Sequence, residues 1–285
     1  MLLIVGLVVV FGSIIGGYLM HHGELAVLWQ PNEVLIIGGS ALGALIIGNP
    51  ASTIKRAGGA VIGLLKPSPF SHHTYEELLQ VLYAVFQKSR KDGLVGLEAH
   101  IEAPEKSDLF KKYPTFLANP HAVSTLCDTL KVLLTGAVEN HHLSDVLDMD
   151  LEQYHHEAMQ VPNAITKVSD ALPGFGIVAA VLGVIITMGS IGGSAALVGQ
   201  KVAAALVGTF LGILLSYGVV GPIAQAIEGR IAQEHAYLLT IRTALLAFAR
   251  GDAPMSAVEF ARRSIEPLER PSFTKLEGLL RGKAA

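Results

Sequence analysis

Residues 171–199 read ALPGFGIVAAVLGVIITMGSIGGSAALVG, and residues 202–227 read VAAALVGTFLGILLSYGVVGPIAQAI. Neither stretch contains Asp, Glu, Lys, Arg or His. A helix needs about 20 mainly apolar residues to cross the hydrocarbon core of a bilayer. Both stretches are long enough, so they predict two membrane-spanning helices joined by a short loop.

Two further stretches without these five residue types lie near the N-terminus, at 2–20 and 34–48. The first has the required length, and no Lys or Arg precedes it, so we interpret it as a retained span rather than a signal peptide. The second reaches the required length only if Pro31, Asn32 and residues 49–51 lie in the headgroup region. The sequence therefore predicts an all-α, polytopic inner-membrane protein with four transmembrane helices and a large helical cytoplasmic domain.

The composition agrees with a membrane protein. Apolar residues make up 51% of the chain, charged residues 16%, and the mean hydropathy is +0.49. A soluble domain carries about 25% charged residues. The net charge of −3 gives no reason to expect a nucleic-acid partner. The single cysteine, Cys127, excludes an intrachain disulfide and a Cys-based metal site, and we expect it to pack as a small apolar residue.

The distribution of basic residues predicts the orientation, because cytoplasmic loops carry an excess of Lys and Arg. Eleven of them lie in 51–170 and nine lie after residue 227, whereas 21–33 has none. We therefore expect both termini in the cytoplasm and the loops 21–33 and 192–201 in the periplasm. The predicted regions are 1–50 with the first two spans, 51–170 as a cytoplasmic helical domain, 171–227 with the last two spans, and 228–285 as a cytoplasmic helical tail.

Local signals predict helices in the cytoplasmic part. Residues 53–66 suit a helix in the membrane interface, Thr74 to Glu77 suggests a capping box, and Asn119 precedes Pro120 as an N-cap. The charged stretch 88–98 is interrupted by glycines that disfavour a continuous helix, which predicts an exposed turn.

The sequence shows no enzyme motif: it has no phosphate loop, no G-x-S-x-G and no H-E-x-x-H. Eight of the eleven histidines form four adjacent pairs, at 21–22, 72–73, 141–142 and 155–156. Adjacent residues on a helix point about 100° apart, and the i, i+4 spacing of zinc helices is missing. We therefore expect no metal, no cofactor and no enzymatic activity.

The polar and proline residues of the last two spans are few. Pro173 and Pro222 lie near the predicted cytoplasmic ends and could be ordinary kinks. Thr209 could bond its own helix backbone, as a lone membrane Thr usually does. The G-x-x-x-G spacings at 12–16, 39–43 and 208–212 predict close helix packing, within the chain or between subunits. No span as counted holds a titratable side chain, so a partner would have to supply the carboxylate of any proton path.

Several ordered segments together resemble the flagellar stator subunits of the MotA type, in the MotA/TolQ/ExbB proton channel family. These segments are GGYLM (16–20), QPNEVLIIGG (30–39), KSRKDGLVGLE (88–98), LPGFGIVAAVLGV (172–184), VGTFLGILLSYGVVGP (207–222), VEFARR (258–263) and ERPSFTKLE (269–277). The resemblance implies a subunit that converts proton flow into torque for flagellum-dependent motility and chemotaxis. It further implies a homo-oligomeric ring of five copies around a dimer of MotB, a single-span, peptidoglycan-anchored partner that carries the proton-accepting aspartate.

The resemblance also assigns roles to individual residues. Pro173 and Pro222 match the prolines that couple ion flow to conformational change. Arg90 and Glu98 match charged residues that face the rotor protein FliG.

Ala180 and Thr209 match positions that line the ion path. Sodium-driven relatives tend to have Thr at the position of Ala180, and a methyl group cannot coordinate sodium as an oxygen can. We therefore expect the translocated ion to be a proton.

Two alternative functions remain open at this stage. An ExbB/TolQ-like channel subunit would energise outer-membrane processes, but such chains have three spans and a large cytoplasmic segment after the first. Here that segment follows the second span. A small-solute transporter would usually have more spans and polar midplane sites.

Overall fold

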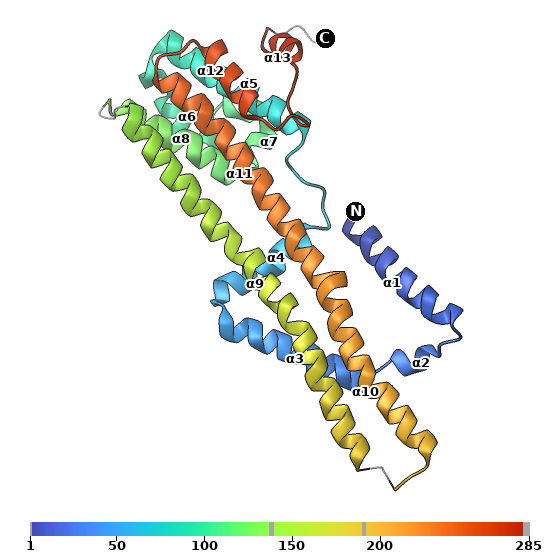
Figure 1. Cartoon of the computed structure of the whole chain (residues 1–285). Coiled ribbons are helices and arrows are strands. Elements are labelled where there is room, and N and C mark those ends of the chain that lie inside the picture. The colour runs from blue at the N-terminus through green and yellow to red at the C-terminus, as the bar shows by residue number, and fades with distance from the viewer. Residues whose placement is uncertain (1, 137–139, 190–191, 282–285) are drawn as a thin grey trace. The chain divides into compact units, whose positions relative to one another are not determined.

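The computed structural model describes residues 2–136, 140–189 and 192–281, which are helical and contain no β-strand within these ranges (Figure 1). They form two compact units. The membrane unit comprises residues 1–67 and 158–229, and the charged unit comprises 68–157 and 230–285. The charged unit holds 16 of the 21 basic and 20 of the 24 acidic residues of the chain.

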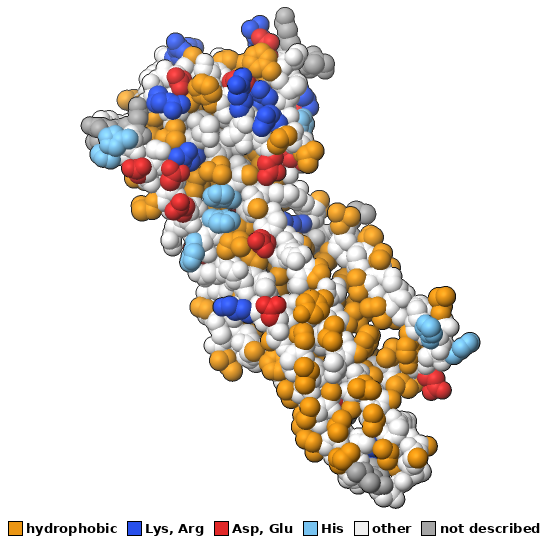
Figure 2. All heavy atoms as spheres, in the orientation of Figure 1, with side chains coloured by type: hydrophobic (Ala, Val, Ile, Leu, Met, Phe, Trp, Pro, Cys, Tyr) orange, Lys and Arg blue, Asp and Glu red, His pale blue; other side chains and the backbone are white. Residues whose placement is uncertain are grey.

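Four helices among the described residues are long and apolar enough to cross a membrane, as the sequence predicts. They contain α1 (Leu2–Met20), α3 (Pro31–Gly48) after the short α2 (Leu25–Leu28), α9 (Asn140–Met188), and α10 (Ala195–Leu215) followed by the π-helical turn η4 (Ser216–Val220) and by α11 (Gly221–Ala249). Large hydrophobic side chains are exposed along all four, and Figure 2 shows them gathered over the spans. We therefore treat the apolar parts of these helices as lipid- or subunit-facing spans of a multi-pass membrane protein.

The helix ends differ from the predicted span ends in three places. The second span begins at Pro31, so Glu33 lies in the first turn of α3 and not in a loop. The last span begins at Ala195, because the Ser194 side chain accepts a hydrogen bond from the Leu197 N–H as an N-cap. The helix α9 begins 31 residues before the apolar stretch and continues through Pro162 and Pro173. A lack of charge therefore marks the lipid-facing stretch but not the residue at which the helix begins.

The interface helix predicted at 53–66 is present as α4 (Ala51–Gly63), with Lys55 and Arg56 exposed. The Asn119 N-cap is confirmed, since its side chain accepts a hydrogen bond from the Ala122 N–H at 3.1 Å. The predicted capping box was wrong in register, because it joins Ser71 and Thr74. The Glu77 carboxylate instead accepts from the Phe116 N–H at 2.8 Å.

The charged unit is built around the long helix α5 (His72–Asp92). The remaining helices of this unit are η1 (Leu94–Leu97), α6 (Glu98–Glu102), η2 (Pro104–Lys106), η3 (Phe110–Lys112), α7 (Pro114–Leu117), α8 (Pro120–Leu134), α12 (Pro254–Ser264) and α13 (Phe273–Leu280), together with the first part of α9 and most of α11. Gly93, with a φ of 76°, ends α5 and confirms the predicted break.

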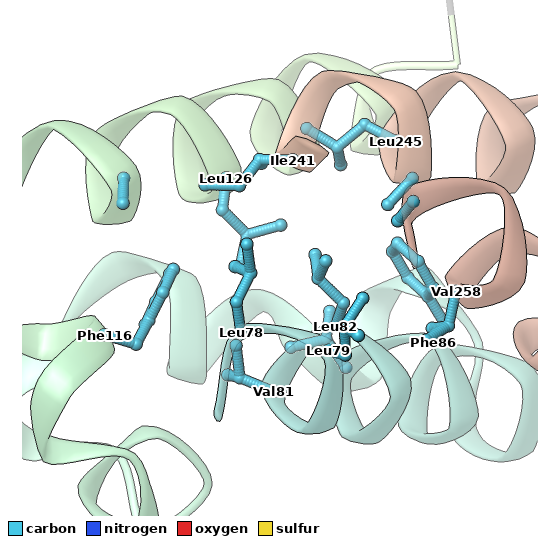
Figure 3. Close-up of a cluster of buried hydrophobic side chains, with 14 of the residues drawn as sticks. Leu78, Leu79, Val81, Leu82, Phe86, Phe116, Leu126, Ile241, Leu245 and Val258 are labelled. Carbon is cyan, nitrogen blue, oxygen red and sulfur yellow. The ribbon is translucent and has the colours of Figure 1, made fainter. Parts of the chain in front are cut away.

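The core of the charged unit lies between α5, α8, α11 and α12. Figure 3 shows Leu78, Leu82 and Phe86 of α5 directed toward side chains of the other helices. The rings of Phe86 and Phe248 stack with centroids 4.4 Å apart. Cys127 is buried here, and burial raises the pKa of its thiol to about 11. The prediction that Cys127 packs as an apolar residue is confirmed.

Candidate functional site

The contact between α9 and α10 is made by glycines that let the two backbones approach closely. A Cβ atom on Gly176 would lie 2.8 Å from the Gly208 carbonyl oxygen, and one on Gly212 would lie 2.7 Å from the Leu172 carbonyl oxygen. The 208–212 glycine pair therefore packs within the chain. A Cβ on Gly12, Gly16, Gly39 or Gly43 would meet no described atom within 4 Å outside its own helix.

Ala180 and Thr209 lie on facing sides of this α9–α10 contact. A Cβ on Gly208, the neighbour of Thr209, would lie 3.2 Å from the Ala180 backbone nitrogen. Both residues are half-buried. The structure thus brings together the two residues that the sequence analysis assigned to the ion path, at a place where backbone approach leaves little room for side chains.

Glu33 of α3 is a buried carboxylate beside the same contact. Its side chain is 8% exposed, and Oε2 lies 2.7 Å from the position of a Cβ on Gly208. Among the described residues, Oε2 has no hydrogen-bond partner. The sequence analysis placed Glu33 in a loop and concluded that the spans hold no titratable group, which was wrong. Two signals could have found it: proline at the first helical position and an acidic residue in the first turn.

Pro173 and Pro222 lie in segments that pack against each other. Pro173 is inside α9, and Pro222 is the second residue of α11, directly after η4. Four residues before Pro173, the Ser169 hydroxyl donates to the Ser216 carbonyl at 3.0 Å. Neither proline interrupts its helix, since α9 is continuous and η4 leads directly into α11. A π-helical turn, and not a simple kink, directly precedes the helix that contains Pro222.

Arg90 and Glu98 belong to the charged unit, so the predicted site residues fall into two groups on different units. Arg90 is exposed near the end of α5, and Glu98 is exposed at the start of α6. The turn at Gly93 separates them, and Lys88 forms an ion pair with Asp92 at 2.9 Å beside it. The geometry presents mixed charges at an exposed turn, as the sequence predicts.

Sequence reasoning missed a histidine contact between α9 and α11. The rings of His155 and His235 lie with centroids 4.7 Å apart, and neither Nδ1 has a hydrogen-bond partner among the described residues. Burial, and then the neighbouring His155, lower the pKa of His235. Within the described ranges, no group of three or more His, Cys, Asp or Glu side chains could hold a metal ion.

Known proteins match the chain along most of its length. The model of the motility protein A N-terminal family matches residues 4–93, and that of the MotA/TolQ/ExbB proton channel family matches residues 121–239. The motility protein A of Salmonella typhimurium is 39% identical, covering 97% of this chain and 94% of that protein. The chemotaxis protein LafT of Vibrio parahaemolyticus is 35% identical, with 95% of each chain covered.

Two solved structures share the fold. A chain of the flagellar MotAB stator complex from Bacillus subtilis superposes with a TM-score of 0.72 at 23% identity, covering 90% of this chain and 92% of that one. A chain of MotAB from C. jejuni superposes with a TM-score of 0.76 at 18% identity, covering 95% and 98%. The relatives are motility proteins and not enzymes. The chain therefore belongs to the motility protein A family, the stator subunits of the bacterial flagellar motor.

Proposed function

We propose that this chain forms a proton channel with a single-span, peptidoglycan-anchored partner of the MotB type and converts proton flow into torque on the rotor. The observation that carries the proposal is the glycine-lined contact of α9 and α10, which brings Ala180 and Thr209 together beside the buried Glu33. The two solved structures of similar fold are MotAB complexes, which supports a partner of this type.

Within this channel, Ala180 and Thr209 line the path and the buried Glu33 carboxylate, which lies against Gly208, exchanges protons beside them. A single carboxylate cannot carry a proton across the full thickness of the bilayer, so the partner supplies a further acceptor. The ion is a proton, because the Ala180 methyl group offers no oxygen ligand for sodium.

Pro173 and Pro222 couple proton transfer to a change of helix arrangement. Shifting a two-state element from 1:99 to 99:1 needs about 5.5 kcal/mol. A proton crossing the membrane potential supplies about 2.3 kcal/mol per 100 mV. One proton therefore produces a useful population shift only if the two arrangements are nearly equal in free energy. Helix segments loosened by proline are suited to this balance.

Arg90 and Glu98 contact the rotor protein FliG by charge, with both termini and the charged unit in the cytoplasm. Five copies of the chain form a ring in the inner membrane around a dimer of the partner. The glycines at 12–16 and 39–43, where an added Cβ would meet no described atom within 4 Å outside its own helix, are suited to contacts between copies.

Complementation tests this proposal directly. The chain, expressed with its partner in cells that lack both stator subunits, should restore rotation of tethered cells. Rotation should stop with a protonophore and continue without sodium. Sodium-dependent rotation would overturn the choice of ion. A chain that inserts and binds the partner but energises outer-membrane uptake and no rotation would support an ExbB/TolQ-like function.

A further inference from the structure

A hydrogen bond between α9 and η4 connects the two proline-bearing segments. The Ser169 hydroxyl donates to the Ser216 carbonyl oxygen at 3.0 Å, and the two hydroxyl oxygens lie 3.3 Å apart. Both side chains are buried, with Ser169 4% and Ser216 0% exposed. A Cβ on Gly221 would lie 3.0 Å from the Ser216 carbonyl oxygen and 3.3 Å from the Ser169 hydroxyl, so the Ser169 side chain lies close against this turn.

The Ser216 carbonyl is also the acceptor that defines the π-helical turn. It accepts from the Gly221 N–H, five residues ahead. In an α-helical register the same N–H would bond the Tyr217 carbonyl, four residues back. The choice between the two carbonyls decides whether this part of the last span is wound as a π-helix or as an α-helix.

Pro222 brings these two registers closer in free energy, because its ring would clash with the Gly218 carbonyl, four residues back, only in the α-helical register. It has no N–H, so one carbonyl lacks its backbone donor in either case. That carbonyl is Gly218 in the α-helical register and Tyr217 in the π-helical one. The lost hydrogen bond is common to both registers, whereas the clash penalises only the α-helical one, so a single added donor can decide between them.

We propose that Ser169 is a positioning residue that holds the last span in the π-helical register through its hydrogen bond to the Ser216 carbonyl. We call this contact the Ser169 latch. Without this hydrogen bond, η4 can change from the π-helical to the α-helical register. This change alters the orientation of the helix that begins at Gly221 and contains Pro222. The link to torque rests on the proposed stator function, whereas the link to the helical register does not.

The chain offers a matched control for this contact. Ser169→Ala removes the donor. Ser216→Ala removes a hydroxyl of the same kind at similar depth but keeps the carbonyl that accepts the bond. Hydrogen–deuterium exchange of the peptide covering Ser216–Gly221, measured on the complex with its partner, reports the turn without any need for rotation. The peptide covering α5 in the charged unit serves as an internal reference for folding.

In Ser169→Ala, exchange of Ser216–Gly221 should be roughly fivefold faster, as expected for the loss of one intramolecular hydrogen bond. Ser216→Ala should exchange nearly as the unsubstituted chain does, and α5 should not change in either variant. Torque per stator should fall in Ser169→Ala and not in Ser216→Ala.

Three results would overturn the latch. The two variants could accelerate exchange equally, which indicates ordinary packing. Exchange could instead stay unchanged in both variants, which would indicate that the hydrogen bond contributes nothing to the turn. Exchange of α5 could rise together with that of η4 in Ser169→Ala, which indicates general unfolding. If the unsubstituted chain drives no rotation, the proposed function fails, and the exchange comparison still decides on the latch.

Discussion

The two units of the molecule are stabilised in different ways. In the charged unit, large aromatic and aliphatic side chains fill a core in which Phe86, Phe116 and Tyr237 are almost fully buried. In the membrane unit, α1 buries none of its side chains, and α9 meets α10 through glycine backbones. Membrane helices commonly pack through small residues, because lipid tails offer large apolar side chains the same contacts as protein does. The charged unit therefore holds its shape through its own core, whereas the spans are arranged by backbone contacts that a small change can shift.

The largest difference between the units should appear on truncating a core side chain. Leu82→Ala should lower the free energy of unfolding of the charged unit by about 2–5 kcal/mol, because a cavity remains where Leu82 was fully buried. The control is Ile47→Ala in α3, where the side chain is 90% exposed. Its effect should stay within about 0.5 kcal/mol. Native-state hydrogen exchange measures the loss of stability, in α5 for Leu82→Ala and in α3 for Ile47→Ala. Similar losses in the two variants would contradict the comparison.

The membrane unit should instead respond most to added volume at its glycines. Gly212→Ala places a Cβ 2.7 Å from the Leu172 carbonyl oxygen, so α9 and α10 must separate. Overpacking of this kind costs about 1–3 kcal/mol. We expect reduced torque at a normal protein level, measured on tethered cells. Gly199→Ala is the control, since a Cβ there would meet no described atom within 4 Å beyond its own stretch of helix. Equal torque in the two variants would show that the glycine contact is not needed for rotation.

The histidine contact makes the charged unit sensitive to acid. The pKa of His235 is lowered in the folded state by burial and by His155, whereas an unfolded histidine titrates near about 6.5. The folded state therefore binds fewer protons. The contribution of neutral His235 to the stability of the folded state is complete above about pH 6.5. It is lost as the pH falls through the lower pKa that His235 has in the folded state.

The measurement is the thermal midpoint of the full chain at about pH 7.5 and about pH 5.5, on either side of the histidine range. His235→Gln should reduce the loss on acidification. His156→Gln, at the exposed position next to His155, should leave the loss of thermal midpoint on acidification unchanged. If both substitutions act alike, the contact between the two rings is not the cause.

The smallest effects should come from the exposed charges of the charged unit. Neutralising Arg90 or Glu98 alone should change the interaction with the rotor by about 0–1 kcal/mol, because exposed charges are screened by water. Reversing both charges should impair rotation and leave membrane insertion and ring assembly intact. Swimming speed and the level of assembled stator are the two readouts. A loss of assembly in the double variant would indicate a structural role.

Much of the fold could be predicted, because lipid imposes a strong pattern on sequence. Runs without charge located all four spans, and Gly93 and Asn119 marked helix boundaries correctly. The span ends could not be predicted from charge alone, since they are set by the Ser194 N-cap and by Pro31 at the first helical position. For this reason Glu33 was assigned to a loop.

The site could be predicted only in part. The family resemblance assigned Ala180 and Thr209 to the ion path, and the structure places them on two helices that pack against each other. The contacts of Ser169 with Ser216 and of His155 with His235 join residues 47 and 80 positions apart, and neither pair carries a local pattern. Such contacts depend on how helices pack, which a single sequence does not encode in its periodicity.

Proton flux into liposomes tests most directly the central claim that this chain conducts protons only together with its partner. The purified chain alone should give a flux close to that of empty liposomes, because Glu33 is a single carboxylate among the described residues of the spans and the proposed central acceptor belongs to the partner. Adding the partner should produce a flux that Glu33→Gln reduces and Glu24→Gln, at an exposed position, does not. A strong proton flux through the chain alone would contradict the account.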